Sequence, residues 1–440
     1  MTTAASLRHP QRPHDPSCSA LTANVKLRDV AGLQDPFAFF SSNTTVKNAR
    51  DWSCRQNEIS GLFQEYELGT KPPKPDSIKA TLTSSSSTAA TLSITVTHGG
   101  KNITFSPTIS YPTSGQSPYP AVIGIGGVSI PKPQGVATIN FDNNGMGAQL
   151  GQSSRGQGLF YTLYGSNATA GAMMAWAWGV SRIIDALEVT PSAGIDPKRL
   201  AVTGCSRNGK GAFIAGAFDE RIALTLPQES GSGGSSCWRV SDYMKKGGIN
   251  TQTASQIINE NVWFSPNFNT FGKNGVLPLP VDHHLLPAIT APRGLFVIEN
   301  SDYVWLGPES SYKCMQAGRA VYQALGVADN FGFSQIGGHG HCSFPSNTQG
   351  TQLDAFYQKF FFGKNTSTNI FETDQGYTAG NQTWVNWSIP NLVKGDGSAF
   401  SVSTALPTAT AKPTATATAT ATPTPRPSGN DSDDDGEDNE

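Results

Sequence analysis

The chain has 440 residues, of which 31 are basic and 33 acidic, so its formal net charge is only −2. This length is ample for a sizeable core in one large domain or two ordinary ones, and the charge balance argues against nucleic acid or an anionic membrane as the main partner. No apolar run reaches the length of a transmembrane helix, and the first ten residues lack the apolar segment of a secretory leader.

Other features favour an oxidising, extracellular compartment. The six cysteines can all pair, and charged residues are sparse while Ser, Thr, Gly and Asn are plentiful. Seven Asn-x-Ser/Thr sequons are potential glycosylation sites: Asn43, Asn102, Asn167, Asn365, Asn381, Asn386 and Asn430. We therefore expect a secreted, monomeric glycoprotein whose leader is missing from this sequence.

Composition divides the chain into three segments. Residues 1–17 contain Pro and His and are expected to be disordered, whereas residues 18–400 are expected to form one folded domain. Residues 401–440 form a Thr/Ala/Pro-rich stretch that ends in an acidic run, and such a segment cannot bury enough apolar surface to fold. It is typical of an O-glycosylated linker with a disordered tail.

The first half of the folded domain predicts a helical cap and then an antiparallel meander. Short apolar pieces up to Glu67 indicate the cap, and residues 78–111 alternate with period two. The turn at 98–102 contains two glycines and joins the last two runs of this meander. The run 118–127 is continuously apolar and ends in glycines, as expected of a strand buried on both faces.

The second half alternates helices and strands. Residues 170–189 carry apolar side chains at helical spacing, which indicates core packing, and a strand follows at 200–203. Strand, helix and strand form a βαβ unit, so the sheet is at least partly parallel. Further elements are predicted as strands at 223–229 and 293–299, a helix at 312–325 and a last strand at 331–336.

The segment 200–212 has the layout of a nucleophile elbow, in which a tight strand-to-helix turn lifts a serine above the sheet. The serine would be Ser206, with Gly204 two residues before it. The usual pattern is G-x-S-x-G, but here Asn208 takes the place of the second glycine, which is displaced to Gly209. The alternative interpretation is an ordinary βα turn that carries a serine.

A serine hydroxyl is a weak nucleophile and needs a base. His339 and His341 follow the last predicted strand, where an α/β-hydrolase places its histidine. His283 and His284, in a Pro-rich loop, are weaker candidates. The alternative is that each of these histidines belongs to the surface or the core.

A third group must orient the base, and three carboxylates are candidates. Glu229 ends the strand after the elbow, whereas Glu299 and Asp302 follow the next strand, where most α/β-hydrolases carry the acid. The residues alone do not separate these three, and any of them could be a solvated carboxylate at a strand end.

The cysteines favour His341 as the base. Cys205 precedes Ser206 and Cys342 follows His341, so hydrogen-bond contact between serine and histidine would bring the two cysteines near bridging distance. Two buried free thiols are the alternative. The other four cysteines allow three pairings, of which we favour Cys18–Cys54 with Cys237–Cys314.

Three motifs together resemble the fungal glucuronoyl esterases of carbohydrate esterase family 15. They are Thr203-Gly-Cys-Ser-Arg-Asn-Gly-Lys-Gly-Ala212, Pro227-Gln-Glu-Ser-Gly-Ser-Gly-Gly234 and His339-Gly-His-Cys-Ser-Phe-Pro345. Members of this family cleave the ester between 4-O-methyl-glucuronic acid on xylan and lignin alcohols. The resemblance runs from about residue 18 to about residue 396. We therefore expect an α/β-hydrolase, a three-layer αβα sandwich with a mixed, mostly parallel central sheet.

The resemblance also implies roles for individual residues. Ser206 would be the nucleophile, His341 the base and Glu229 the acid, and the three disulfides would be those favoured above. Arg207 resembles the arginine that stabilises the oxyanion. The residues that resemble the family's contacts to the sugar hydroxyls and methoxy group are Lys210, Gln252, Glu260 and Trp305.

We therefore expect a serine esterase that acts on glucuronoyl esters of lignin–carbohydrate complexes. No metal or organic cofactor is implied, because the sequence has no H-E-x-x-H, no clustered ligand set and no phosphate-binding glycine loop after the first strand. Two alternatives stay open: another carbohydrate esterase on the same fold, such as an acetyl xylan esterase, and a non-catalytic wall-associated glycoprotein.

Overall fold

The computed structural model describes residue 18 and residues 26–42, 44–377 and 384–393. These residues all fall within one compact unit, Met1–Thr404. The segments 1–17 and 401–440, and the sequons at Asn43, Asn381 and Asn430, lie outside the described residues, so the expectations for them stay predictions.

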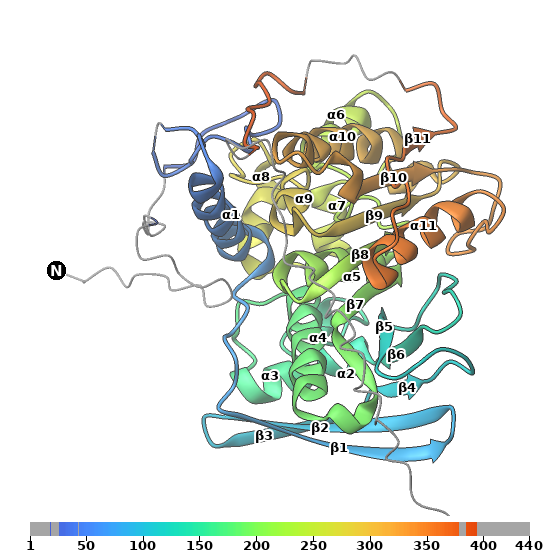
Figure 1. Ribbon diagram of the computed structural model, residues 1–440. Helices are drawn as coiled ribbons and strands as arrows, with labels where there is room; N and C mark the ends of the chain where they lie inside the picture. Colours follow the sequence, from blue (N-terminus) through green and yellow to red (C-terminus); the bar gives the residue numbers. More distant parts are fainter. Residues whose placement is uncertain (1–17, 19–25, 43, 378–383, 394–440) are drawn as a thin grey trace, which may run out of the picture. The chain divides into compact units, whose positions relative to one another are not determined.

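An 11-stranded sheet runs through the described part of the chain in the order β1-β2-β4-β6-β5-β7-β8-β9-β10-β11, with β3 paired to β2 (Figure 1). Its strands are β1 (Ser77–Ser86), β2 (Ala89–His98), β3 (Lys101–Phe105), β4 (Thr108–Ser110), β5 (Tyr119–Ile125), β6 (Ala137–Phe141), β7 (Ile195–Cys205), β8 (Ile222–Gln228), β9 (Gly294–Glu299), β10 (Phe331–Gln335) and β11 (Phe371–Thr373). The pairs from β6 to β11 are parallel and those among β1, β2, β3, β4 and β6 are antiparallel. The sheet is therefore mixed and mostly parallel, as predicted.

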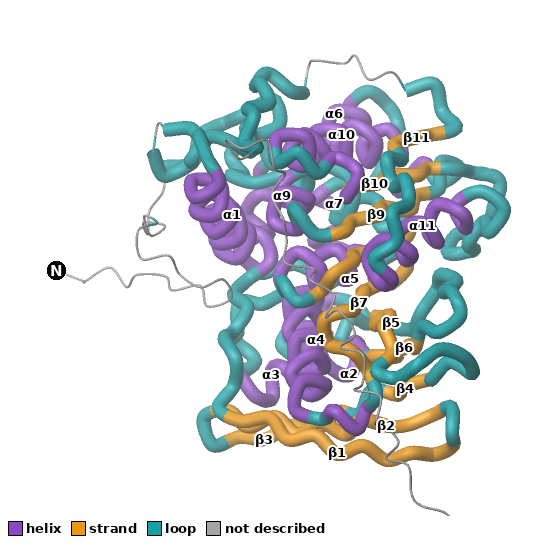
Figure 2. The backbone as a smooth tube through the Cα atoms, viewed as in Figure 1, coloured by secondary structure: helices purple, strands orange, loops and turns teal. Residues whose placement is uncertain are grey.

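Helices cover both faces of this sheet (Figure 2). The α-helices are α1 (Ala49–Phe63), α2 (Asn143–Met146), α3 (Leu159–Tyr164), α4 (Ala172–Val189), α5 (Arg207–Phe218), α6 (Trp238–Lys246), α7 (Ala254–Glu260), α8 (Asn269–Asn274), α9 (Leu285–Thr290), α10 (Pro308–Ala324) and α11 (Gln349–Phe362), and a π-helical turn, Gln64–Leu68, continues α1. The α4, α5, α9 and α10 helices pack on one face and α11 on the other. None of the helices in the described residues has the length and apolarity needed to cross a bilayer.

The buried strands show why the chain forms three layers. In β5, Val122 belongs to the apolar cluster under α11, whereas its neighbour Ile123 belongs to the larger cluster under the other helices. The same alternation holds for Ala201 and Val202 in β7. Because successive side chains of a strand point to opposite faces, a continuous apolar run buries both faces of the sheet.

The antiparallel meander is confirmed. The β2 and β3 strands pair through the turn at Gly99 and Gly100, whose φ values of 56° and 75° suit glycine. The prediction that 331–336 is the last strand was wrong, because β11 pairs in parallel with β10 through Phe333 and Phe371. A three-residue strand is too short to show an alternating pattern.

Three disulfides staple the domain, and they are the pairs favoured from the sequence. Cys18–Cys54 reaches α1, Cys237–Cys314 joins the residue before α6 to α10, and Cys205–Cys342 joins the end of β7 to the loop after β10. The third of these disulfides brings the two sequence regions that carry Ser206 and His341 together.

Candidate active site

Ser206 sits at a sharp turn between β7, which ends at Cys205, and α5, which begins at Arg207. Its backbone has φ 59° and ψ −126°, a conformation that favours glycine, and its N–H donates to the carbonyl of Gln228 at 3.0 Å. The turn therefore has the geometry of the predicted nucleophile elbow.

The displaced glycine of the motif has a steric explanation. A Cβ on Gly204 would lie 2.5 Å from the carbonyl oxygen of Asn208, and a Cβ on Gly209 would lie 2.4 Å from that of Gln228. These are the two positions at which the elbow needs glycine. The side chain of Asn208 fits because Gly126 opposite has no Cβ; one there would lie 2.3 Å from Asn208 Nδ2.

His341 is bonded to a buried carboxylate. Its Nδ1 lies 2.6 Å from Oε2 of Glu229, whose side chain is only 1% exposed, whereas the histidine side chain is 25% exposed. Glu229 directly follows β8, and its N–H donates to the carbonyl of Ile298 at 2.7 Å. With Nδ1 engaged by the carboxylate, Nε2 is the ring nitrogen that remains to exchange a proton.

The loop that carries His341 is held by the loop that follows β9. The hydroxyl of Tyr303 accepts the N–H of His341 at 2.7 Å, and Asp302 accepts the N–H of Gly338 at 2.6 Å. The rings of Tyr303 and Trp305 lie edge-on to the imidazole, with centroids 5.4 and 4.9 Å away. These contacts fix both the main chain and the ring of the histidine.

The structure separates the three candidate acids. Among the described residues, the side chain of Glu299 accepts hydrogen bonds from the segment after Glu229, and the side chain of Asp302 accepts the N–H of Gly338. Neither carboxylate bonds a histidine in the described residues. His339 lies farther from the acid than His341 does, with Nδ1 3.9 Å from Glu229 Oε1. Of the three candidate acids, Glu229 is therefore the one that bonds a candidate base, and that base is His341.

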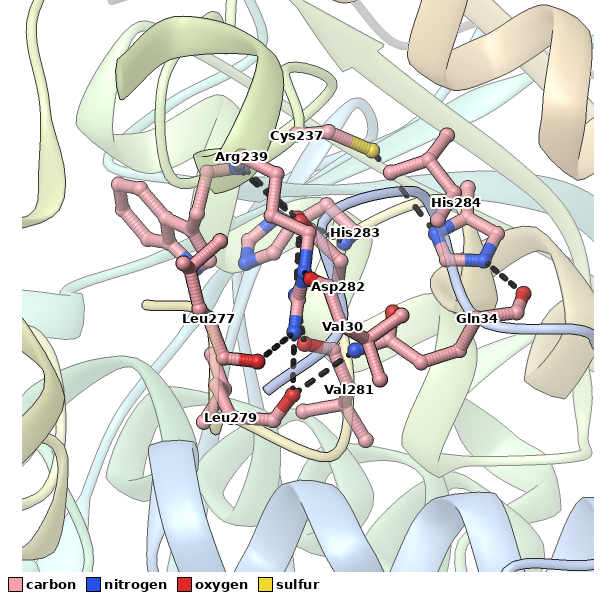
Figure 3. A network of polar contacts seen from close by, with 12 residues as sticks. Val30, Gln34, Cys237, Arg239, Leu277, Leu279, Val281, Asp282, His283 and His284 are labelled. Carbon is pink, nitrogen blue, oxygen red and sulfur yellow. Dashed lines mark hydrogen bonds and ion pairs between the residues drawn. The ribbon is translucent and has the colours of Figure 1, made fainter. Parts of the chain in front are cut away.

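The two weaker histidine candidates lie in the protein core and bond other buried groups. His283 and His284 are buried in a polar network around Asp282 (Figure 3). His283 Nε2 lies 2.6 Å from Oε1 of Glu67, and His284 Nε2 lies 2.8 Å from the carbonyl oxygen of Gln34. Burial lowers the pKa of His284 to about 4, so this side chain is neutral in the fold.

A pocket of about 440 Å³ opens at the elbow. It is lined by Cys205, Ser206, Arg207, Asn208, Lys210, Gln252, Glu260, Trp263, Trp305, His341 and Cys342. All the predicted sugar contacts therefore line one cavity together with the predicted nucleophile and the predicted base, and Glu229 bonds the histidine from outside this lining.

Comparison with known proteins decides the family. Residues 94–326 match the family described as fungal glucuronyl esterase. The chain is 54% identical over 376 residues to the 4-O-methyl-glucuronoyl methylesterase of Hypocrea jecorina, covering 86% of this chain and 79% of that one. It is 55% identical over 365 residues to the enzyme of the same name from Podospora anserina, covering 82% and 74%.

The chain belongs to the fungal glucuronoyl esterases.

Solved structures of this family share the fold. The glucuronoyl esterase catalytic domain from Hypocrea jecorina superimposes with a TM-score of 0.81 at 54% identity, over 84% of this chain and all of that one. A mutant of the glucuronoyl esterase from Sporotrichum thermophile, in complex with methyl 4-O-methyl-beta-D-glucopyranuronate, gives a TM-score of 0.80 at 48% identity, over 86% of this chain and 100% of that one.

Lys210 is the buried cation of this esterase's pocket. Its side chain is 3% exposed, and Nζ donates to the carbonyl of Ser230 at 2.5 Å. Burial lowers the pKa of the ammonium to about 8, against the opposing pull of Glu299 and Glu260. On the same pocket, the Gln252 amide donates to the Glu260 carboxylate.

Two aromatic residues near Ser206 and His341 were not predicted from the sequence. Trp263 lines the pocket and lies under the guanidinium of Arg207, 5.8 Å from ring centroid to Cζ, and Tyr303 bonds the His341 main chain. Both lie in irregular segments where no periodicity marks them. The sequence holds one indication for Trp263: it lies three residues after Glu260, which was itself a predicted sugar contact.

One group of side chains near the elbow has the spacing of metal ligands. A ring nitrogen of His341 and the sulfurs of Cys205 and Cys342 all lie within 4.8 Å of one another. The two sulfurs are joined in a disulfide and carry no thiolate charge, so this donor set does not suit a metal ion. The disulfide instead places the serine-bearing turn beside the histidine loop.

Three non-glycine residues in the described part of the chain have positive φ, and all three belong to this site. They are Ser206 at 59°, Glu229 at 44° and Cys342 at 64°. Such conformations cost roughly 1–3 kcal/mol each and persist where the surroundings enforce them. Here hydrogen bonds between strand ends and the disulfide supply the restraint.

Proposed function

We propose that this chain is a serine esterase that hydrolyses ester bonds between 4-O-methyl-D-glucuronic acid of glucuronoxylan and lignin alcohols. The observation that carries the proposal is the bond from Glu229 to His341, beside the elbow serine Ser206 and in a pocket with polar groups suited to a sugar. The named activity of relatives that are 54–55% identical, and a family structure bound to a methyl glucuronate, support the same substrate class.

The first half of the reaction forms an ester on the enzyme. His341 Nε2 takes the proton from Ser206 Oγ, which attacks the uronoyl carbonyl carbon, and Glu229 stabilises the imidazolium that forms. When the tetrahedral intermediate collapses, the bond to the alcohol oxygen breaks and His341 gives its proton to the departing alcohol. In the second half, water takes the place of the alcohol and releases the uronic acid and the free serine.

Arg207 is suited to hold the oxyanion. It is the first residue of α5, so its N–H is one of the unpaired donors at a helix start, where the helix dipole favours negative charge. Its guanidinium lies over Trp263 and forms no ion pair with a carboxylate among the described residues. Its charge therefore remains available to the tetrahedral intermediate.

The other pocket residues suit a hydroxylated ring. Lys210 and the bonded pair Gln252–Glu260 offer donors and an acceptor for sugar hydroxyls. Trp305 is 40% exposed although it is aromatic, so it presents an apolar face on which a sugar ring and its methoxy group can pack.

Secretion is also part of the proposal. Three disulfides in one domain are typical of proteins made in an oxidising compartment. The described sequons, which are potential glycosylation sites, are all exposed: Asn102, Asn167, Asn365 and Asn386. That the enzyme is monomeric, and that it binds neither nucleic acid nor membranes, stays a prediction.

The test compares hydrolysis of benzyl glucuronate with that of a simple acetyl ester, for wild type and Ser206→Ala. We expect turnover of the glucuronate by the wild type and none by the variant. Preference for the acetyl ester would keep the serine chemistry and reject the glucuronoyl substrate. No turnover of either ester would favour a non-catalytic glycoprotein.

A further inference from the structure

The carboxylate that ends β9 gathers the segment that follows the catalytic acid. Glu299 is 1% exposed, and its Oε1 accepts the N–H and the hydroxyl of Ser230, both at 2.9 Å. The same oxygen accepts the hydroxyl of Ser235 at 2.7 Å and the N–H of Gly231 at 3.3 Å. Four donors from residues 230–235 thus meet on one oxygen atom.

Ser230 links this carboxylate to two groups of the active site. It follows Glu229 directly in the chain, and its carbonyl oxygen accepts the Lys210 ammonium at 2.5 Å. A shift of Ser230 would therefore move the acid that orients the base and the cation assigned to the sugar at the same time.

Glu229 needs such a restraint. Its φ of 44° is unfavourable for a residue with a side chain, so the chain on either side has to hold it in place. Two neighbouring residues of β9 do so, because the Ile298 carbonyl accepts the Glu229 N–H and Glu299 accepts the N–H of the next residue.

Burial raises the pKa of the Glu299 carboxyl, and the hydrogen bonds from Ser235, Ser230 and Gly231 only partly oppose this, while the nearby Glu229 adds to it. An unprotonated carboxyl oxygen accepts these donors whether or not the group is ionised, so the positioning of residues 230–235 does not require a charge on Glu299.

We propose that Glu299 is a positioning residue, which fixes Glu229 and Lys210 relative to each other through Ser230. The position after β9, where most α/β-hydrolases carry the acid itself, here supports an acid placed on the neighbouring strand. This inference rests on the proposed function, because it assigns Glu299 a part in the same reaction.

Two substitutions at one position test it. Glu299→Gln keeps an acceptor oxygen where Oε1 stands, whereas Glu299→Ala removes it. Because a small displacement of a catalytic group costs up to about a hundredfold in rate, we expect Glu299→Ala to lower kcat on benzyl glucuronate about tenfold to a hundredfold and to raise KM several-fold. Glu299→Gln should bring both constants back to within about threefold of wild type.

Glu58 supplies a matched control. It is also a buried carboxylate that accepts main-chain N–H groups, those of Phe40 at 3.0 Å and Ser41 at 2.8 Å, but it lies on α1 and not among the residues that line the pocket. We expect Glu58→Ala to lower Tm without changing kcat or KM of the folded enzyme.

A readout without substrate separates this inference from the proposed function. The proton on His341 Nδ1, which is hydrogen-bonded to Glu229, should give a strongly downfield NMR resonance in wild type, in Glu299→Gln and in Glu58→Ala. This resonance should be absent from the spectrum of Glu299→Ala. Failure of wild type to cleave benzyl glucuronate would reject the proposed function but leave this resonance as the test of the positioning role.

Three results would overturn the inference. They are an unchanged resonance in Glu299→Ala, wild-type kcat and KM in that variant despite a lower Tm, and equal losses in the Ala and Gln variants. If Glu299→Ala does not fold, Ser235→Ala removes one of the four donors and should change kcat and KM in the same direction by a smaller factor. Wild-type constants in that variant would likewise count against the role.

Discussion

Oε2 of Glu229 lies 2.6 Å from Nδ1 of His341, although the two residues come from loops after strands that are not neighbours in the sheet. Glu229 follows β8, which pairs with the strand that leads to Ser206, and His341 follows β10. A hydrogen bond this short to a buried carboxylate is strong and fixes the orientation of the imidazole.

Removing this acid should cost far more than removing its nearest alternative. We expect Glu229→Ala to lower kcat by about a thousandfold or more, because the imidazole loses both its orientation and the charge that stabilises its protonated form. Asp302→Ala should lower kcat about tenfold or less, because this substitution removes one hydrogen bond to the loop that carries His341. Steady-state kinetics on benzyl glucuronate measure both, and equal losses would contradict the acid assignment.

Tyr303→Phe tests the support of the base. The substitution keeps the ring that packs on His341 and removes only the hydroxyl that accepts its N–H. A hydrogen bond of this kind contributes about 0.5–1.5 kcal/mol, so kcat should fall roughly threefold to tenfold. KM should stay unchanged because Trp305, the proposed sugar contact, is untouched; an effect confined to KM would argue against this role.

Lys210 predicts a pH dependence of substrate binding. Its pKa of about 8 means that the ammonium loses its proton as the pH rises through that value. The KM for a glucuronate should therefore rise above about pH 8, while kcat should not follow the same curve. Lys210→Met, which has no charge to lose, should show a high KM that does not change over this range. A wild-type KM that stays flat through pH 8 would contradict the prediction.

His284 predicts a loss of stability in acid. Burial lowers its pKa to about 4, whereas the unfolded chain has the ordinary value of about 6.5. As the pH falls from 6.5 toward 4, the unfolded chain takes up a proton that the folded chain does not, so the free energy of unfolding decreases. The difference of about 2.5 between the two pKa values corresponds to roughly 3 kcal/mol.

A variant isolates this contribution from that of other titrating groups. His284→Gln can still donate toward the Gln34 carbonyl but does not titrate, so its unfolding free energy should depend less steeply on pH. Urea unfolding of both proteins at neutral pH and near pH 4 gives, for each protein, the change in unfolding free energy between the two pH values. Parallel pH profiles for wild type and variant would show that His284 does not cause the loss.

Local patterns were sufficient to predict the parts of this molecule that depend on neighbouring residues. The elbow around Ser206 could be predicted because a buried strand, a glycine and a helix of small residues follow one another directly. Likewise, the run around Val122 is apolar throughout because both faces of β5 are covered. The three disulfides were also predicted, one of them from the positions of Cys205 and Cys342 next to the reacting residues.

The choice of acid could not be derived from local pattern. Glu229, Glu299 and Asp302 all lie at or shortly after the ends of parallel strands, and the one that bonds His341 is Glu229, whose φ is 44°. A single backbone angle leaves no periodic signal. Trp263 and Tyr303 were missed for a related reason, since they act from irregular segments whose course is set by packing against distant residues.

The positive φ angles at Ser206 and Glu229 set stability against turnover in this enzyme. Glycine adopts such angles without steric penalty, so glycine at Ser206 or Glu229 would relieve backbone strain while removing a group that the proposed reaction needs. A library of variants screened for heat resistance and not for ester cleavage should therefore gather glycine at these two positions and yield stable but inactive proteins, whereas at Cys342 the loss of the disulfide would outweigh the relieved strain. Engineering for harsh process conditions should therefore keep these three positions fixed and seek its gains elsewhere in the domain.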